Sequence, residues 1–315
     1  MAFRSGFVSI IGRPNAGKST LLKALVGEKI AIVTRKPQTT RNRIQGIVNV
    51  EKKGKRPAGQ IVLIDTPGVH KPINSLNRRM MKEVYDALEG CDLLLLIVDA
   101  TEKFGSGDQY VIDIAKRTKL PAILLLNKVD ALQKDKLLPL IAHYSELHDF
   151  ADMIPISALE KKGLDVLLDA IIKALPEGPR YFSSEQITDQ PERFLVAELI
   201  REQVLQFTSQ EVPHATAVLI DGYEESPKLT RISATVYCER EGQKAILIGK
   251  QGANLKKIGT YARLQIERLL GVKVFLELFV KVQPGWRDSR GFVEEMDWRR
   301  QLEHLSGSHK FREKP

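Results

Sequence analysis

Residues 12–19 read Gly-Arg-Pro-Asn-Ala-Gly-Lys-Ser and fit the pattern G-x-x-x-x-G-K-[ST]. A strand-like apolar run precedes this segment, and helical apolar spacing follows it from Lys18 to Val26. A glycine-rich loop in that position presents backbone N–H groups to an anion, and the dipole of the following helix adds to the attraction. The Lys18 side chain can place a positive charge on the terminal phosphates, and the Ser19 hydroxyl can bind Mg²⁺. The predicted phosphate-binding residues are Gly12, Asn15, Ala16, Gly17, Lys18, Ser19, Thr20 and, further along the chain, Gly68.

A second segment, Asp65-Thr66-Pro67-Gly68, follows another apolar strand-like run. Open α/β sheets bind ligands at the carboxyl ends of their strands, so Asp65 can hold Mg²⁺ through water and the Gly68 amide can sense a γ-phosphate. Thr39 and Thr40 lie in the basic segment 35–43, where a threonine hydroxyl could complete the Mg²⁺ shell when the γ-phosphate is present. Taken alone, that segment would be interpreted as an ordinary solvated loop. The predicted metal ligands are Ser19, Thr40 and Asp65.

The segment Asn127-Lys128-Val129-Asp130 has the residue types needed to read a guanine base. Asp130 can accept two hydrogen bonds, from the guanine ring N–H and from the exocyclic amine. Adenine presents an acceptor at the ring position, and the unpaired carboxylate would then cost on the order of a few kcal/mol. Asn127 can brace the loop, and the stem of Lys128 can lie over the ring. Ser157 and Ala158 follow the next strand-like run and could offer a backbone N–H to the guanine oxygen, so the predicted ligand is GTP.

The pattern of apolar residues predicts two domains of different architecture. From residue 7 to about 175, short apolar runs alternate with helical segments, which predicts a doubly wound, mostly parallel α/β domain with one antiparallel edge hairpin. Prolines and a glycine at 176–180 indicate a linker. Beyond it the predicted order is helix, two strands, short helix, long helix and strand, which is an α+β domain. The predicted divisions are 1–178 for the nucleotide-binding domain, 179–192 for the linker, 193–285 for the second domain and 286–315 for a C-terminal extension.

Composition limits the setting in which this chain works. With 315 residues, 43% of them hydrophobic, it can bury a sizeable core, and its two cysteines argue against a disulfide framework and for a reducing cytoplasm. The formal net charge of +9 fits a polyanionic partner and does not choose between nucleic acid and an anionic membrane surface. The N-terminal residues lack the apolar region of a signal peptide, and the longest apolar run, Leu93–Val98, is too short to span a bilayer. Any membrane contact is therefore expected to be peripheral.

The second domain contains one G-x-x-G segment, Gly249-Lys250-Gln251-Gly252, between two predicted helices. Such a loop lets a nucleic-acid backbone approach closely, and a KH domain clamps about four nucleotides in this way. Residues 231–290 hold 12 lysines and arginines against 5 acidic residues, which is the electrostatic footprint of backbone binding; a solvated basic face is the alternative. The predicted RNA-binding residues are Ile248, Gly249, Lys250, Gln251, Gly252, Lys256 and Lys257.

The combination of these motifs resembles the Era family of GTPases, in which a P-loop GTPase domain precedes a type II KH domain. The resemblance rests on GRPNAGKS, Gln38-Thr39-Thr40-Arg41, DTPG, NKVD and ISA, and it covers nearly the whole chain. It implies GTP hydrolysis, binding near the 3′ end of 16S ribosomal RNA and a role in assembling the 30S subunit. It also implies that Thr40, with Thr39 beside it, is the switch threonine. Asn15 matches the loop asparagine that accompanies potassium stimulation in related enzymes, so the implied cofactors are GTP or GDP, Mg²⁺ and, as a further candidate, K⁺.

One position departs from the Ras-like pattern and slows the expected reaction. Val69, which with Thr39 and Thr40 makes up the predicted switch residues, follows Gly68, where Ras-like enzymes carry the glutamine that orients the attacking water. Slow intrinsic turnover is therefore expected. The expected protein is a cytoplasmic monomer with no DNA partner. One alternative is a GTPase at the inner membrane surface, whose basic domain binds anionic lipid or another RNA. Another is a passive RNA-binding scaffold with a degenerate nucleotide site, against which the intact Lys18, Ser19 and Asp65 argue.

Overall fold

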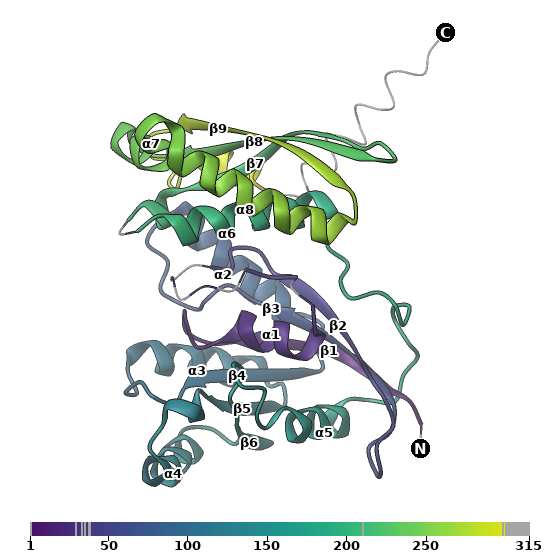
Figure 1. The fold of residues 1–315 in the computed structure, drawn as a ribbon. Coiled ribbons are helices and arrows are strands. Elements are labelled where there is room, and N and C mark those ends of the chain that lie inside the picture. Colours follow the sequence, from purple (N-terminus) through teal and green to yellow (C-terminus); the bar gives the residue numbers. More distant parts are fainter. Residues whose placement is uncertain are drawn as a thin grey trace. The chain divides into compact units, whose positions relative to one another are not determined.

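The computed structural model describes residues 2–28, 30–32, 34, 36, 39–209, 211–297 and 299. The chain divides into two compact units. The first unit is Met1–Lys71 with Met80–Gln190, and the second is Pro72–Arg79 with Pro191–Pro315. Figure 1 labels the helices and strands of each unit. Gln38 of the predicted switch segment and residues 300–315 of the predicted C-terminal extension lie outside the described residues.

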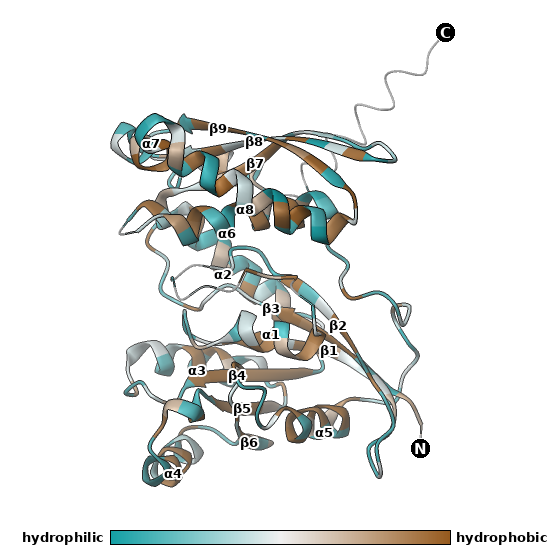
Figure 2. Cartoon of the chain, viewed as in Figure 1, coloured by the Kyte–Doolittle hydropathy of each residue, from teal (hydrophilic) through white to brown (hydrophobic). Residues whose placement is uncertain are grey.

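The first unit is built on a six-stranded sheet with the order β2-β3-β1-β4-β5-β6. Its strands are β1 (Arg4–Ile11), β2 (Ile44–Val50), β3 (Gly59–Asp65), β4 (Leu93–Asp99), β5 (Ala122–Asn127) and β6 (Asp152–Pro155). Only the β2–β3 pair is antiparallel, and the other neighbours are parallel. Figure 2 shows hydrophobic residues concentrated in the central strands β4 and β5. The apolar runs therefore form strands that are buried on both faces, as the sequence predicts.

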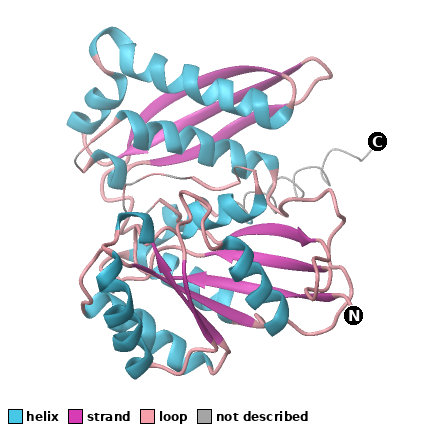
Figure 3. Ribbon diagram, turned by 60° about the horizontal axis from the view of Figure 1, so that its bottom comes forward, coloured by secondary structure: helices cyan, strands magenta, loops and turns pink. Residues whose placement is uncertain are grey.

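Helices cover both faces of this sheet (Figure 3). They are α1 (Lys18–Val26), α2 (Ser75–Leu88), α3 (Ser106–Thr118), α4 (Leu137–Leu147) and α5 (Leu164–Ala174). One buried cluster joins Val84 of α2, Ile112 of α3 and Tyr144 of α4 to alternate residues of β4 and β5. On α1, Leu22 lies close to Gly46 of β2, and on α5, Ile172 lies close to Gly59 of β3. Short 3-10 turns at Val129–Ala131 and Lys134–Lys136 complete the first unit.

The carboxyl ends of the parallel strands lie along one edge of the sheet and carry the predicted motifs. The G-x-x-x-x-G-K-[ST] loop follows β1, DTPG begins at the end of β3, and NKVD begins at the end of β5. The register pairs Asp99 of β4 with Asn127 of β5, so the loops after these two strands start side by side. This edge is where open α/β sheets bind their ligands.

The segment that the sequence suggests as a linker is attached to the first unit. The buried Gln60 side chain of β3 accepts hydrogen bonds from the backbone N–H groups of Tyr181 (2.8 Å) and Phe182 (2.9 Å). The backbone N–H of Ile47 in β2 donates to the carbonyl of Ile187 at 2.9 Å. These bonds fix the chain after α5 along the β2–β3 edge as far as residue 190, where the first unit ends.

The second unit has three strands and four helices among the residues that the structure describes. Its elements are α6 (Glu192–Phe207), β7 (Ala217–Glu224), β8 (Leu229–Cys238), α7 (Glu241–Ile248), α8 (Ala253–Leu270), β9 (Lys273–Val282) and α9 (Arg290–Glu295), with 3-10 turns at Val212–Ala215 and Lys250–Gly252. β8 lies between β7, to which it is antiparallel, and β9, to which it is parallel. The buried core joins Val196 of α6 and Ile258 of α8 to Ile232 of β8 and Val274 of β9. The predicted order of helices and strands is confirmed.

None of the helices within the described part of the chain is long and apolar enough to cross a membrane.

Candidate nucleotide-binding and RNA-binding sites

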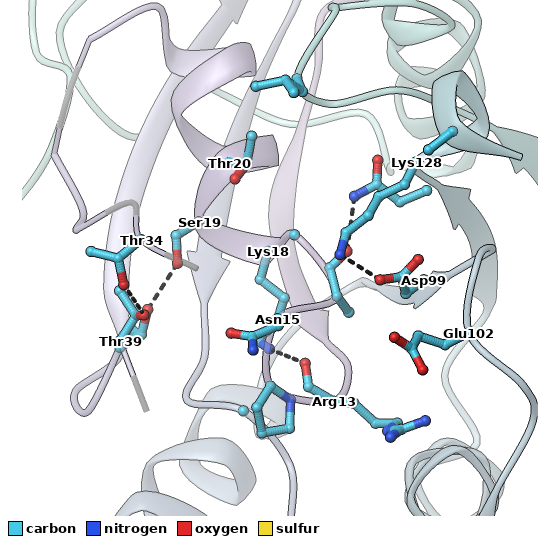
Figure 4. Close-up of a pocket in the computed structure, with 18 of the residues that line it drawn as sticks. Arg13, Asn15, Lys18, Ser19, Thr20, Thr34, Thr39, Asp99, Glu102 and Lys128 are labelled. Carbon is cyan, nitrogen blue, oxygen red and sulfur yellow. Dashed lines mark hydrogen bonds and ion pairs between the residues drawn. The ribbon is translucent and has the colours of Figure 1, made fainter. Parts of the chain in front are cut away.

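A cavity of about 790 Å³ in the first unit is lined by the loops at the carboxyl edge of the sheet (Figure 4). The predicted residues that line it are Asn15, Ala16, Gly17, Lys18, Ser19, Thr20, Thr39, Thr40, Gly68, Asn127, Lys128 and Asp130. Five described residues that were predicted for the nucleotide site are not part of the lining: Gly12, Asp65, Val69, Ser157 and Ala158. The volume suits a nucleotide, because small-molecule sites typically measure about 300–1,000 Å³.

Lys18 is held in the floor of this cavity by the loop that precedes it. Its ammonium group is buried and donates to the carbonyl oxygens of Gly12 at 3.0 Å and Arg13 at 2.9 Å. Burial lowers the pKa of Lys18 to about 8, and the attraction of Asp65 opposes that shift. The side chain therefore stays mostly protonated at neutral pH, and a phosphate in the cavity would meet a poorly solvated cation.

Gly17 brings the phosphate loop (residues 12–19) into contact with the base loop (residues 127–130). Its φ of 105° lies in the left-handed region, and a Cβ atom there would come within 2.1 Å of the Asn127 side-chain nitrogen. With glycine in place, Asn127 donates to the Ala16 carbonyl at 2.8 Å. The two motifs are thus joined directly, and a side chain at position 17 would separate them.

The three predicted metal ligands lie within hydrogen-bond distance of one another. The Ser19 hydroxyl donates to Asp65 Oδ2 at 2.8 Å, and the Thr40 hydroxyl lies 3.2 Å from the same oxygen. The other carboxylate oxygen, Oδ1, is buried and has no hydrogen-bond partner among the residues that the structure describes. Burial raises the pKa of Asp65 to about 6, although Lys18 and the two hydroxyls pull it down. Two hydroxyls and a carboxylate with an open oxygen fit Mg²⁺, which takes oxygen ligands and keeps several waters.

The structure distinguishes the two predicted switch threonines. Thr40 is buried beside Asp65, whereas the Thr39 hydroxyl donates to the carbonyl of Lys36 and lies 3.0 Å from the Thr34 hydroxyl. The remaining predicted switch residue, Val69, is 1% exposed, and its side chain belongs to the core cluster beneath α2 and α3. Its backbone N–H donates to the Gly12 carbonyl at 3.0 Å. The valine side chain therefore packs in the core, which is not a position from which it could orient water in the cavity.

The base loop is braced by the residues that follow β6. Asn127 is buried, and its side-chain oxygen accepts from the Ala158 N–H at 3.0 Å. The buried Ser157 hydroxyl accepts from the Glu160 N–H at 3.1 Å and fixes the turn. Asp130 is exposed at the cavity wall. The contact that the sequence predicts between residues 157–158 and the base stays a prediction, because in this structure the Ala158 N–H is occupied by Asn127.

Several residues that line the cavity were not identified from the sequence. They are Arg13, Pro14, Ile32, Thr34, Asp99, Glu102, Asp108, Ala131 and Leu159. Arg13 forms an ion pair with Asp108 at 2.8 Å, which ties the phosphate loop to the start of α3. Leu159 directly follows the ISA segment and is 75% exposed, an unusual state for a leucine. The sequence could have identified Asp99 as a residue of the site, since it ends a strand-like apolar run at the ligand-binding edge of the sheet.

The raised pKa of Asp65 predicts a pH-dependent requirement for Mg²⁺. The carboxylate is the form that attracts the cation, and it is lost as the pH falls through about 6. Protons and Mg²⁺ then compete, so we expect the half-saturating Mg²⁺ concentration for GDP binding to rise about tenfold per pH unit below 6 and to level off toward pH 7, below the pKa of Lys18. Titration with Mg²⁺ at pH 5 to 7 measures this dependence.

The control for this prediction is Asp65→Asn, which keeps the side-chain shape and cannot titrate. The terminal phosphate of the nucleotide also takes up a proton in this pH range. Because Asp65→Asn has no carboxyl group to titrate, the pH dependence of its Mg²⁺ requirement shows the effect of the phosphate alone. A wild-type Mg²⁺ requirement with the same pH dependence as that of Asp65→Asn would contradict the prediction.

The predicted RNA-binding loop lies between α7 and α8 of the second unit. Gly249 has a φ of 71°, and a Cβ atom there would lie 2.9 Å from the backbone nitrogen of Asn254. Gln251 and Gly252 also adopt positive φ values, 52° and 78°. Lys250 and Gln251 are exposed at the tip of the loop. The loop is therefore tightly folded, and its two middle residues face solvent.

The lysines that follow the loop differ in their surroundings. Lys256 is exposed on the first turns of α8. Lys257 is exposed as well, but its ammonium lies 4.4 Å from the ring centroid of Phe207, at the end of α6. This cation–π contact competes with a role of Lys257 in binding phosphates, so Lys250 and Lys256 are the better placed cations.

Comparison with known proteins identifies the family of this chain. The family described as "50S ribosome-binding GTPase" matches residues 7–128, and the family described as "KH domain" matches residues 211–287. GTPase Era of Ruminiclostridium cellulolyticum is 47% identical over 300 residues, which cover 95% of this chain and 99% of that protein. The chain belongs to the Era family of GTPases.

Two solved structures of Era share this fold over almost their whole length. Era in complex with MgGDPNP and nucleotides 1506–1542 of 16S ribosomal RNA has a TM-score of 0.89 at 38% identity, covering 94% of this chain and 99% of that one. A variant of Aquifex aeolicus Era bound to GDP and AlF4⁻ has a TM-score of 0.88 at 38% identity, covering 93% and 99%. The predicted family and the predicted fold class, a P-loop GTPase domain followed by a KH domain, are confirmed.

Proposed function

We propose that this protein is a GTP-hydrolysing switch that binds the 3′ region of 16S ribosomal RNA and acts in assembly of the 30S subunit. The observation that carries the proposal is the likeness, over 94% of the chain, to an Era structure solved with MgGDPNP and nucleotides 1506–1542 of that RNA. The cavity of the first unit and the G-x-x-G loop of the second supply the two binding sites that such a switch needs.

In the nucleotide site, the loop N–H groups and Lys18 bind the phosphate chain, and Asp130 reads the guanine edge. Ser19, Thr40 and Asp65 hold Mg²⁺, which supplies charge neutralisation on the β- and γ-phosphates. Thr40, itself a metal ligand, and the Gly68 amide respond to the γ-phosphate, because both residues line the cavity. Val69 leaves the attacking water without a glutamine partner, so turnover by the protein alone is slow.

In the RNA site, the loop from Ile248 to Gly252 binds the RNA backbone. Lys250 lies at the tip of this loop, and Lys256 lies beside the loop. Close approach of phosphates to a loop of this shape depends on glycine at its ends and on cations next to them. Ordering of the Thr40 segment by GTP changes the affinity of the KH domain for RNA, which makes the protein a switch.

Asn15 is the candidate residue for stimulation by K⁺. We assign residues 1–178 to the GTPase domain and 193–285 to the KH domain, and the segment between them packs on the GTPase domain as far as residue 190. The cytoplasm is the proposed site of action.

RNA binding by the purified protein with a GTP analogue, with GDP and without nucleotide tests this function. We expect tight binding to a fragment of the 16S RNA 3′ end, stronger with the analogue, and slow release of phosphate from GTP. Equal RNA affinity in all three nucleotide states would overturn the switch. Binding to vesicles of anionic lipid that RNA fails to displace would instead favour a GTPase at the membrane surface.

A further inference from the structure

Lys128 of the base loop reaches across the cavity wall to a carboxylate on a different strand. Its ammonium group forms an ion pair with Asp99 Oδ2, at the carboxyl end of β4 (Figure 4). The Asp99 side chain is 13% exposed and that of Lys128 is 38% exposed, and both residues line the cavity. The pair is therefore partly sheltered from water, and it fixes the far end of a long, flexible side chain.

Asp99 is itself held in place by its surroundings. Its other oxygen, Oδ1, accepts from the Thr101 backbone N–H at 3.0 Å and from the Thr101 hydroxyl at 2.6 Å. The Ala100 N–H donates to the Asn127 carbonyl at 2.8 Å, which ties the chain after β4 to the residue before Lys128. Burial alone would raise the pKa of Asp99, but the hydrogen bonds from Lys128 and Thr101 outweigh it and lower the pKa. The carboxylate is consequently ionised and aimed at Lys128 at neutral pH.

We propose that Asp99 is a positioning residue for guanine nucleotides, which holds the stem of Lys128 across the cavity so that it covers the face of the base. The proposal rests on the proposed nucleotide site and adds a residue to it. Asp130 reads the edge of the base, whereas the Asp99–Lys128 pair acts on its face. Asp99 thus raises the affinity for the nucleotide and leaves the choice of base to Asp130.

The physical basis is preorganisation of a lysine side chain. A free lysine loses much of its rotamer freedom when it packs against a ligand, and this loss opposes binding. The ion pair with Asp99 restricts the rotamers of Lys128 before the nucleotide binds, so the Lys128 stem is already placed to stack on the base. Removing the charge of Asp99 should lower the affinity for GDP and GTP alike, by about tenfold, because one side chain is released.

A double-mutant cycle tests the proposal, with GDP and GTP affinities measured for the wild type, Asp99→Asn, Lys128→Ala and the double variant. Asparagine keeps the shape of the side chain and the acceptor for Thr101, so the loop retains its bonds. We expect Asp99→Asn to weaken binding about tenfold in the wild type and to have no further effect once Lys128 is alanine. If it weakens binding equally in both backgrounds, Asp99 acts through the loop or directly on the nucleotide, and the proposal is wrong.

Two further measurements distinguish positioning from general damage to the site. Inosine triphosphate lacks the exocyclic amine, and Asp99→Asn should weaken its binding by the same factor as that of GTP, because the stem covers the ring without reading its edge. Asp135→Asn is the matched control: it removes one carboxylate from an exposed position shortly after the base loop and should bind like the wild type. A wild type that fails to bind GTP would refute the proposed function itself, whereas normal wild-type binding without coupling would refute only the role of Asp99.

Discussion

Replacing Asp130 with asparagine should weaken GTP binding at least about a hundredfold and let xanthosine triphosphate bind in its place. In the proposed site, the Asp130 carboxylate would accept from two N–H groups of guanine, whereas an amide would accept from one and turn an N–H donor toward the other. Xanthine carries an oxygen where guanine carries the amine, so the side-chain amide introduced by Asp130→Asn finds both a donor and an acceptor. A site built on such hydrogen bonds discriminates strongly, because a mismatch leaves a polar group unpaired.

Competition of GTP and xanthosine triphosphate for a fluorescent guanine nucleotide measures both effects. Asp135→Asn serves again as the control, since it removes a nearby exposed carboxylate. GTP affinity within a few-fold of the wild type in Asp130→Asn, with no gain for the xanthine nucleotide, would mean that Asp130 does not read the base. The loop would then have to recognise guanine through Asn127 or through the residues after β6.

The first unit was largely predictable because its motifs are local and its strands are buried on both faces. Apolar runs such as Leu93–Val98 can hardly form anything but central strands, and a glycine loop between a strand and a helix has one common use. Parallel strands then bring Asp65, Asn127 and the phosphate loop to one edge without any information on tertiary contacts. The resemblance already favoured Thr40 over Thr39 as the metal ligand, and the structure adds the physical reason, because the Thr40 hydroxyl is the one that lies beside Asp65.

The parts that the sequence did not reveal depend on contacts between residues far apart in the chain. Asp99 meets Lys128 only because β4 and β5 pair in one particular register, and Arg13 meets Asp108 only because α3 begins beside the phosphate loop. The attachment of residues 179–190 to β2 and β3 includes the bonds made by a buried glutamine, Gln60, which reads as an ordinary polar residue in a strand. The contact of Lys257 with Phe207 likewise joins two helices, α6 and α8, that are separated in the sequence by β7, β8 and α7.

The second large effect is expected from placing two aspartates in the middle of the G-x-x-G loop, as Lys250→Asp with Gln251→Asp. RNA affinity should fall at least about a hundredfold, because one phosphate contact is lost and two like charges face the backbone. The fold should survive, since both side chains are exposed, and Gln251 has a φ of 52°, a conformation that aspartate adopts more readily than most residues. Changing Gly249 instead would confound the result, because a Cβ atom there would strain the turn against Asn254.

The matched control is Gln133→Asp with Lys134→Asp, which makes the same change in formal charge at exposed positions of the first unit. Binding of a 16S RNA 3′-end fragment and of GDP should be measured for both double variants, with thermal unfolding to confirm that each is folded. Because binding to the RNA backbone depends on charge, the control should lose only the small share that comes from net charge. The loop variant should keep its GDP affinity while losing RNA. Equal losses of RNA affinity in the two variants would show that overall charge, and not the clamp between α7 and α8, holds the RNA.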